Sequence, residues 1–554
     1  MSGFRMRICY IWVSGFKNLN DFGVNLCNDL KFSFSTGSGV LKRVEQTPLP
    51  PEIFAESIHD ITAILGINGA GKSNSLELIC LALKSNDKID TPLLIVYERE
   101  GQFFFIRKSI SHVIPDFDAE EKEDHKDFKD LNVVYFSNVF DENKMDLGKY
   151  VQDISANSRH GRGYPPFGRG RLDTEMIDQL NFISSDIYQH VKIDTPRTLE
   201  IKVDRLIRQR LNSERSHPHK ETFLKLAELQ LEIRKHSGPN NSLQVAAAAI
   251  QGMFLYQVLF ENLDNKELQS RIDEALKNRA GLPPSFKELL YTIADFFKID
   301  ESLGIKNQPV PLVELIEAVV NLESLFFFAR ARLDNSVKSS RYVITLDFLK
   351  DEGLPYIPLA WIMERIRSGS MTWTGISSGQ KAYLNMFSSI WSTLSHSDST
   401  KKSSSTLLCI DEADLYLHPQ WQVEFVERLI YCLPTFLNGK KQIVITTHSP
   451  ILVSDLPSQC LITLPPPSSE HHKESPVTDD LKTFGANLFD IYSSTFGLNG
   501  QRTGNLSSKY ISKILEILDC DDITYHQRET LKQAASIIDD ELIKSHILRR
   551  IKGR

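Results

Sequence analysis

The sequence lacks several features that would assign it to a common class. Its 554 residues carry 64 basic and 71 acidic side chains, so the net charge of −7 excludes a chain that is basic throughout and binds nucleic acid by its overall charge. Its seven cysteines are odd in number and include no Cys-x-x-Cys pair, which argues against a disulfide framework and a zinc site. We therefore expect reduced core cysteines in a cytoplasmic protein.

Long apolar runs and sustained heptads are also missing. No run approaches the roughly 20 residues that a bilayer span needs, and the N-terminus has no signal-peptide core, so no membrane contact is expected. Prolines repeatedly interrupt the helical periodicity between about 150 and 340, which excludes a long coiled-coil arm. This region is therefore predicted to be a compact helical insertion.

The remaining patterns predict an α/β protein. Apolar segments predict strands at 7–16, 60–66, 131–137, 341–348, 406–411 and 442–448. A hairpin is expected in 92–108, with its turn at Glu100 and Gly101, and the charged stretch 116–130 is expected to be a solvated loop. The predicted domains are an N-terminal lobe (1–150), the helical insertion (151–340), a second lobe (341–460), and a linker with a C-terminal helical region (461–554).

A phosphate-binding loop follows the predicted strand 60–66. GINGAGKS (66–73) fits the pattern G-x-x-x-x-G-K-[ST] between a strand and a helix. Its backbone N–H groups and the helix N-terminus suit phosphate oxygens, Lys72 can reach the β- and γ-phosphates of ATP, and the Ser73 hydroxyl can bind Mg²⁺. The expected nucleotide-binding residues are Gly66, Asn68, Gly69, Ala70, Gly71, Lys72, Ser73 and Asn74.

An acidic pair and a histidine follow two later strands. LLCIDE (407–412) places Asp411 at the end of a buried strand, where it can hold Mg²⁺, and Glu412 can orient or deprotonate the attacking water. His448 closes the strand 442–448 and can hydrogen-bond the γ-phosphate or that water. The expected catalytic residues are therefore Lys72, Glu412 and His448, and the expected metal ligands are Ser73 and Asp411.

A second candidate anion site lies in TWTGISSGQKAYLN (373–386). Ser377 or Ser378 can cap a helix that begins near Gly379 and leave N–H groups facing outward. Residues 376–380 resemble the LSGGQ signature of ATP-binding-cassette ATPases and depart from it at Ser378, where glycine is usual. The resemblance implies a homodimer or higher oligomer in which Ser377, Ser378, Gly379 and Gln380 of one copy complete the ATP site of another.

Further motifs resemble one branch of that class. DEAD (411–414) with Leu417-His418-Pro419, TTHSP (446–450) and TFGANLFD (483–490) are similar to the ATPases of Septu and retron anti-phage systems, the PtuA type. The resemblance covers about a third of the chain and is weak across the insertion. It implies an ATP-binding-cassette or SMC-like head split by the insertion. By analogy, Lys17 and Asn18 lie near the adenine and Asn138 takes the place of the family's Q-loop glutamine.

The same resemblance implies partners. Such an ATPase works with a separate HNH nuclease, the PtuB type, which cuts nucleic acid. In retron systems it is also restrained by a reverse transcriptase with its RNA–DNA hybrid. The alternatives are a stand-alone repair ATPase, SMC- or RecF-like, that binds DNA directly, and a self-sufficient nuclease. No H-x-N motif is present, and no Toprim domain like that of overcoming-lysogenization-defect nucleases follows His448, which argues against the self-sufficient nuclease.

Four other segments offer weaker signals. SRHGRGYPPFGRGR (158–171) mixes arginine with aromatic residues and is either a solvated loop or a contact for nucleic acid or a partner. The histidines at 217, 219, 471 and 472 lie in polar loops and are not expected to bind metal. Asp519-Cys520-Asp521 matches a metal-binding D-x-D only by its letters.

Overall fold

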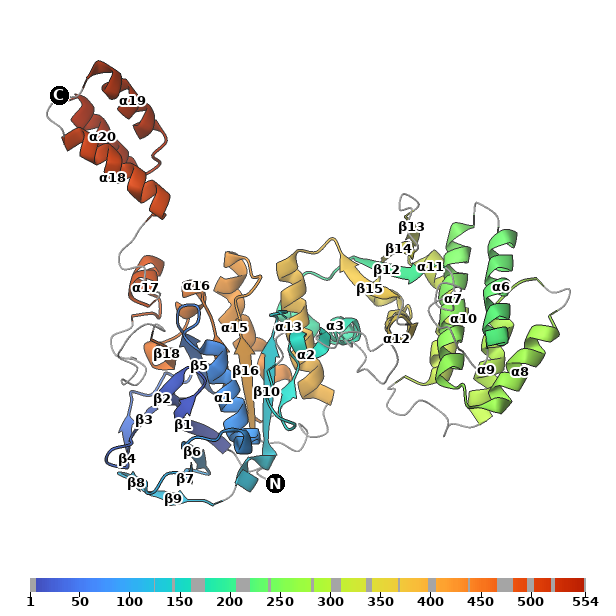
Figure 1. Ribbon diagram of the computed structural model, residues 1–554, viewed down its shortest axis with the longest axis horizontal. Coiled ribbons are helices and arrows are strands. Elements are labelled where there is room, and N and C mark those ends of the chain that lie inside the picture. Colours follow the sequence, from blue (N-terminus) through green and yellow to red (C-terminus); the bar gives the residue numbers. More distant parts are fainter. Residues whose placement is uncertain are drawn as a thin grey trace.

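The structure is a computed structural model of the chain (Figure 1). It describes residues 6–123, 125–141, 145–160, 175–205, 220–237, 241–279, 283–299, 310–334, 341–366, 369–396, 405–436, 439–465, 482–495, 503–519 and 524–552. Within these ranges the strands form sheets of six, five, four and three strands, interleaved with helices. The predicted α/β class is confirmed.

The six-stranded sheet is parallel and has the order β11-β10-β16-β17-β5-β18. Its strands are β5 (Ile58–Leu65), β10 (Leu131–Ser137), β11 (Gln152–Asp153), β16 (Ser405–Asp411), β17 (Lys440–Thr446) and β18 (Leu461–Thr463). β10 and β16 are buried at every position, as expected for parallel strands covered on both faces. Their register sets Ser137 opposite Asp411. Residues far apart in the sequence therefore end at one edge of the sheet.

Helices cover both faces of this sheet. The helices are α1 (Lys72–Lys84), α3 (Glu175–Ser184), α13 (Ser378–His396) and α15 (Pro419–Phe436). Because side chains alternate along a strand, Leu407 and Cys409 of β16 pack with α1, whereas Leu408 and Ile410 pack with α3, α13 and α15. The sheet is therefore the middle layer of three (Figure 1).

The N-terminal residues build two smaller sheets. The five-stranded sheet has the order β2-β1-β6-β7-β9, and the three-stranded sheet has the order β3-β4-β8. Their strands are β1 (Met6–Phe16), β2 (Leu19–Asn25), β3 (Leu30–Ser35), β4 (Val40–Glu45), β6 (Leu93–Arg99), β7 (Gln102–Lys108), β8 (Ile114–Pro115) and β9 (Ala119–Glu121). The predicted hairpin is β6–β7, and both turn residues have positive φ, 55° at Glu100 and 81° at Gly101.

The prediction that residues 116–130 form a loop is wrong in part. β9 lies within it and pairs in parallel with β7, and a 3-10 helix follows at His125–Asp130. An edge strand needs only backbone hydrogen bonds on one side, so a charged sequence can form one without an apolar pattern.

A buried polar network joins the five-stranded sheet to the six-stranded sheet. Arg7 of β1 donates to both carboxylate oxygens of Asp60 in β5, at 2.8 Å from Nε and 2.6 Å from a terminal nitrogen. Gln442 of β17 accepts from the N–H of Ile8 at 2.7 Å and donates to Asp60 at 3.1 Å. Asp60 and Gln442 lie near the starts of their strands, so this network is at the opposite sheet edge from Asp411.

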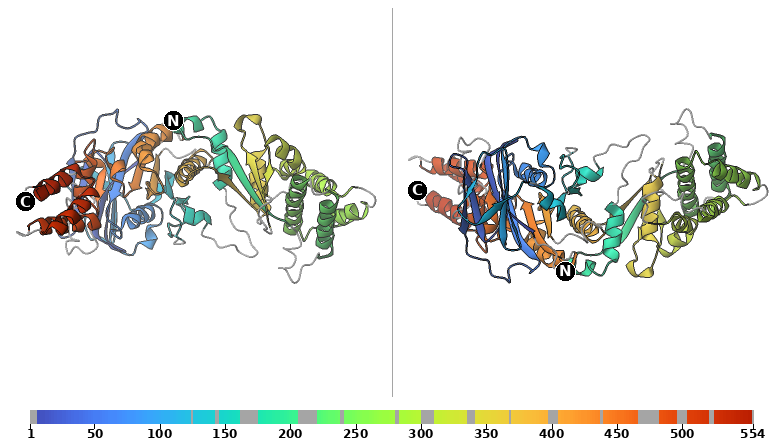
Figure 2. Two further views of the ribbon diagram at one scale, coloured as in Figure 1. Left: turned by 90° about the horizontal axis from the view of Figure 1, so that it is seen from above. Right: turned by 90° about the horizontal axis from the view of Figure 1, so that it is seen from below.

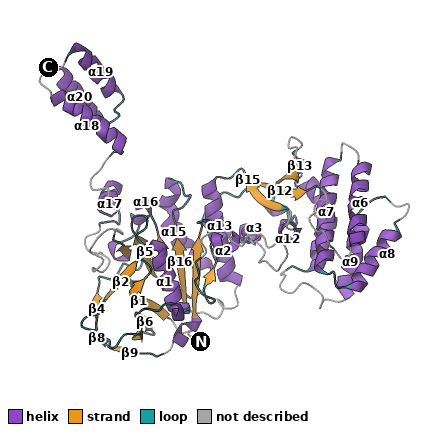
Figure 3. Ribbon diagram, in the orientation of Figure 1, coloured by secondary structure: helices purple, strands orange, loops and turns teal. Residues whose placement is uncertain are grey.

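The region 175–374 contains helices and the four-stranded sheet (Figure 3). Its further helices are α4 (Tyr188–Val191), α6 (Lys220–His236), α7 (Ser242–Glu261), α8 (Lys266–Lys277), α9 (Lys287–Ile299), α10 (Leu312–Val320), α11 (Leu322–Phe328) and α12 (Tyr356–Ile366). The sheet has the order β13-β14-β12-β15. Its strands are β12 (Thr198–Asp204), β13 (Arg332–Leu333), β14 (Arg341–Asp347) and β15 (Ser370–Thr374).

The purely helical prediction for 151–340 therefore missed a strand. The sequence TLEIKVD of β12 buries Leu199, Ile201 and Val203 and exposes the alternate residues more, which is a strand pattern. β12 pairs with β14 along its length, so this sheet runs across residue 340, where the sequence placed a domain boundary.

One helix also contradicts the expectation about apolar runs. α7 has 20 residues and a mean hydropathy of 1.5, so by length and composition alone it is long and apolar enough to cross a membrane. However, 78% of its apolar window is buried inside the protein, as in the core helix of a soluble domain.

The C-terminal residues form a small helical bundle. After α16 (Pro450–Val453) and α17 (Leu488–Thr495), the helices α18 (Asn505–Asp519), α19 (Tyr525–Ser536) and α20 (Glu541–Lys552) share their own apolar cluster. Leu518, Ala535 and Ile547 are fully buried in it. In all views this bundle lies at the end of the molecule opposite α6–α9 (Figure 2).

Candidate functional site

The candidate site begins at the loop between β5 and α1. Gly69 and Gly71 adopt positive φ, 80° and 103°, which lets the chain curl before the helix. Gly71 is the N-cap of α1, and no side chain caps this helix start. The N–H groups of the first turn therefore remain available to an anion, and the partial positive charge of the helix end favours one.

Lys72 lies across this loop. Its Nζ donates to the carbonyl oxygens of Gly66 at 2.9 Å and Ile67 at 3.3 Å. Burial lowers the pKa of Lys72, whereas the nearby carboxylates of Glu412 and Asp411 raise it. The phosphate-loop lysine and the acidic pair, over 300 residues apart in the sequence, are therefore electrostatic neighbours.

The turn after β1 contacts the loop from another side. Asn18 donates to the carbonyl of Gly69 at 3.1 Å and accepts from Asn74 at 2.7 Å. A Cβ on Gly71 would lie 2.9 Å from Asn18 Oδ1, so glycine is needed there for space as well as for φ. Lys17 forms an ion pair with Glu77 of α1. The structure thus sets Asn18 against the phosphate loop, and the expected adenine contact stays a prediction.

Asp411 is buried and held by two hydroxyl groups. The Thr446 hydroxyl donates to Oδ1 at 2.5 Å and the Tyr135 hydroxyl donates to Oδ2 at 3.1 Å. Burial, followed by the charge of Asp411, raises the pKa of Tyr135, so this hydroxyl remains a donor. A carboxylate fixed in this way near Lys72 is the type of oxygen ligand that Mg²⁺ prefers, and the expected metal-binding role of Asp411 and Ser73 stays a prediction.

Glu412 has an unusual backbone. Its φ of 48° is uncommon for a residue with a side chain, and its N–H donates to Thr446 Oγ1 at 2.8 Å. Burial raises the pKa of Glu412, and Asp411 adds to this shift. A carboxylate with a raised pKa, held in place next to Asp411, is suited to accept a proton from water.

His448 follows β17 and is held by Asp414. The Asp414 carboxylate accepts from the backbone N–H of His448 at 3.1 Å and from the Thr447 hydroxyl at 2.5 Å. Burial lowers the pKa of His448, and so does the charge of Lys72. The structure therefore brings His448 into the same group as Lys72, Asp411 and Glu412.

The serine-rich turn is capped as the sequence suggested, and the helix begins one residue earlier than expected. Ser377 Oγ accepts from the N–H of Gln380 at 3.1 Å, and Gln380 Oε1 accepts from the N–H of Ser377 at 2.9 Å. This reciprocal pair is a capping box at the start of α13. Ser377 and Ser378 are exposed, while a Cβ on Gly379 would lie 2.9 Å from the Tyr416 carbonyl oxygen.

Asn138 links the sheet edge to α13. It follows β10, donates to the carbonyl of Ala382 at 3.3 Å, and accepts from Asn385 at 3.2 Å. Its neighbour Ser137 lies opposite Asp411 in the register of β10 and β16. The residue proposed in place of the Q-loop glutamine thus connects the acidic site with the serine-led helix.

Sequence reasoning missed the residues that support this site. Thr446 lies in the TTHSP motif, so it was visible but had no assigned role, and Tyr135 and Asp414 were not assigned to the site. Other predictions fall wholly or mostly outside the described residues: the arginine- and glycine-rich segment 158–171 beyond residue 160, the histidines at 217, 219, 471 and 472, and Cys520 with Asp521.

Comparison with known proteins agrees with this geometry. The family described as "AAA domain, putative AbiEii toxin, Type IV TA system" matches residues 61–454, which is more than half of the chain. The Septu protein PtuA of Bacillus thuringiensis is 45% identical over 58 residues, which is 10% of this chain and 13% of that protein. The match therefore spans a small part of that relative's length. From β5 to α16, this chain belongs to the family of AAA domains described with the AbiEii toxin, and its fold is that of a P-loop ATPase domain.

Proposed function

We propose that this chain is the ATPase subunit of a bacterial anti-phage system of the Septu or retron type. The observation that carries the proposal is the gathering of Lys72, Asp411, Glu412 and His448 around one phosphate loop. The short identity with the Septu protein PtuA and the TFGANLFD segment favour the defence role over a repair role.

Each side chain has a role in the proposed reaction. Lys72 neutralises the β- and γ-phosphate oxygens of ATP, and Ser73 and Asp411 would hold Mg²⁺. When bound, Mg²⁺ would supply positive charge that stabilises the charge developing on the ADP leaving group. Glu412 orients water and accepts its proton, and His448 donates a hydrogen bond at the γ-phosphate. The remaining loop residues, Gly66, Asn68, Gly69, Ala70, Gly71 and Asn74, surround the phosphates.

The ATP site is proposed to be shared by two copies of the chain. In each copy the helix start at Lys72 binds the phosphates of that copy's own ATP. The exposed helix start at Ser377 and Ser378 is then left without a phosphate group to bind in the same copy. In a homodimer, both helix starts can bind phosphate. Each copy then presents its second helix start, Ser377, Ser378, Gly379 and Gln380, to the partner copy's triphosphate.

Mixing two inactive variants tests this sharing. We expect Lys72→Ala and Ser378→Arg to lose ATP hydrolysis when each is assayed alone. Random exchange of subunits then gives heterodimers with one intact shared site, so the mixture should regain about a quarter of the wild-type rate. A mixture no faster than its separate components contradicts the shared site. A wild-type chain without ATPase activity contradicts the hydrolytic role itself.

The proposed partner is an HNH nuclease of the PtuB type, joined in a retron system by a reverse transcriptase with its RNA–DNA hybrid. The test is co-expression of the tagged chain with the genes beside its own, followed by affinity purification and mass spectrometry. A co-purified HNH protein supports the defence role. Tight DNA binding by the isolated chain with no such partner favours the alternative, an SMC- or RecF-like repair ATPase.

A further inference from the structure

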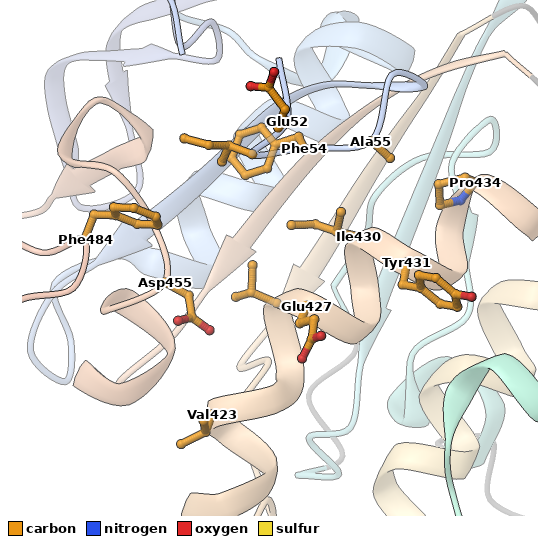
Figure 4. A pocket seen from close by; sticks show the side chains of 12 residues that line it. Glu52, Phe54, Ala55, Val423, Glu427, Ile430, Tyr431, Pro434, Asp455 and Phe484 are labelled. Atoms are coloured by element: carbon orange, nitrogen blue, oxygen red, sulfur yellow. The ribbon is translucent and has the colours of Figure 1, made fainter. Parts of the chain in front are cut away.

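An apolar hollow lies along one side of α15. Its volume is about 750 Å³, and it is bounded by α15, by residues 52–55 before β5, and by the segment after α16 (Figure 4). Val423, Ile430 and Tyr431 form the α15 wall, and Phe54 and Phe484 face them from the other two segments. Three separate parts of the chain therefore build this groove, which we call the α15 groove.

The apolar side chains of the groove are unusually exposed. Phe484, Tyr431 and Val423 expose 60%, 57% and 55% of their surfaces. The opposite side of α15 buries Phe425 and Leu429 in the core, and Val426 in the groove is buried as well, so the exposed side chains of Val423 and Tyr431 are not needed for that packing. A contiguous exposed apolar surface with a polar rim is typical of a site that another molecule covers.

The rim of the groove is acidic and lacks cations. Glu52, Glu427 and Asp455 line it, and within the described part of the chain none of the three forms an ion pair. Burial raises the pKa of Asp455, and the neighbouring charge of Glu427 contributes. These carboxylates repel each other and disfavour a phosphate-bearing occupant, so the complementary group is a cation.

The groove also adjoins the segment that carries His448. Ser449 donates through its hydroxyl to Gln422 of α15 at 2.6 Å. The carbonyl of Ser454 accepts from the N–H of Gly485 at 2.9 Å, next to Phe484. The elements that form the groove walls are therefore hydrogen-bonded to the residues that follow β17.

We propose that the α15 groove is the docking site for a segment of another protein in which a lysine or arginine lies between large apolar side chains. The apolar side chains cover Val423, Tyr431 and Phe484, and the cation lies between Glu427 and Asp455. A two-fold contact centred on the groove would set the same acidic rim against itself, so two copies of this chain are not expected to pair groove to groove. The docking site stands independently of ATP hydrolysis.

A phage-displayed library of random 12-residue peptides tests the proposal against the full-length protein. We expect enriched peptides that combine lysine or arginine with two large apolar residues. In fluorescence polarisation these peptides should bind Glu427→Lys, which reverses a rim charge, and Val423→Asn, which removes an apolar contact without adding charge, at least about tenfold more weakly than the wild type. Glu274→Lys on α8 is the matched control, because this exposed carboxylate is remote from the groove. Thermal unfolding should show that both groove variants remain folded.

Three results would overturn the proposal. One is the absence of any enriched peptide whose binding depends on Glu427 or Val423. Another is an enriched set without basic residues. The third is a loss of oligomer mass for Val423→Asn in light scattering, because the groove would then be an interface between copies.

Discussion

The Thr446 hydroxyl lies 2.5 Å from one carboxylate oxygen of Asp411 and accepts the backbone N–H of Glu412 at 2.8 Å. The Thr446 side chain of β17 thus fixes the positions of both Asp411 and Glu412 at the end of β16. Because Thr446 has no proposed contact with ATP or Mg²⁺, its contribution can be measured apart from theirs.

Thr446→Val should weaken the proposed Mg²⁺ site. The substitution keeps the volume and removes both hydrogen bonds, and losing such support typically lowers metal affinity about 10- to 100-fold. We expect a rise of that size in the Mg²⁺ concentration that half-activates ATP hydrolysis, while Thr446→Ser should stay near the wild type. Equal Mg²⁺ dependence in Thr446→Val and the wild type would mean that Thr446 does not position Asp411.

Gly379→Ala should destabilise the start of α13. Its Cβ would lie 2.9 Å from the Tyr416 carbonyl oxygen, so the helix start or the Tyr416 loop must move, at a cost of about 1–3 kcal/mol. Thermal unfolding measures this cost. Gly37→Ala is the control, because a Cβ there meets nothing within 4 Å. Equal stability of the two variants would show that the close approach at Gly379 is unimportant.

Arg7→Met should cost about 3–5 kcal/mol, because it leaves the carboxylate of Asp60 buried without its cation. The double variant Arg7→Met with Asp60→Asn should recover part of this loss in denaturant unfolding, because the amide carries no charge and its oxygen can still accept from Gln442. Lys88→Met breaks a surface ion pair with Asp146 and should cost less than about 1 kcal/mol. A loss for Arg7→Met no larger than that of Lys88→Met would contradict a structural role for the network.

Lys441 should make stability depend on pH in the alkaline range. Burial, with a smaller effect of Lys440, lowers the pKa of Lys441 to about 8 in the folded chain. The pKa in the unfolded chain is about 10.4, so the unfolded state binds more protons between these values and the free energy of unfolding rises with pH there.

Lys441→Met removes this charge. We expect it to raise stability at pH 7 by about 1–3 kcal/mol and to flatten the pH dependence above pH 8. Unfolding midpoints from pH 7 to pH 10 measure both effects, with the exposed Lys266→Met as the control. An unchanged slope in Lys441→Met would show that the side chain is charged in the folded chain over this range.

Residues whose chemistry depends on local backbone were predictable from the sequence. The eight consecutive residues from Gly66 to Ser73 contain the turn, the lysine and the helix start of the phosphate loop. Likewise, LLCIDE (407–412) contains both the apolar strand and the two acidic residues that follow it. Tyr135 gave no such signal, because its hydroxyl meets Asp411 only through the pairing of β10 with β16.

The missed strand β12 has a different cause. Its alternating residues Leu199, Ile201 and Val203 lie among helical segments, and its neighbours in the sheet, β14 and β15, come from more than 130 residues later. A short strand flanked by helices carries little local information about distant partners.

The strand β15 and the helix α13 are separated only by residues 375–377. β15 is hydrogen-bonded to β12 in the four-stranded sheet, which adjoins the distant helices, and α13 starts at the serine-led turn (Figure 1). A connection of three residues is too short for β15 and α13 to move independently over a large distance. The position of the helix start that carries Ser377 and Ser378 is therefore set from two directions, by the four-stranded sheet through β15 and by the packing of α13 in the core of the ATPase domain.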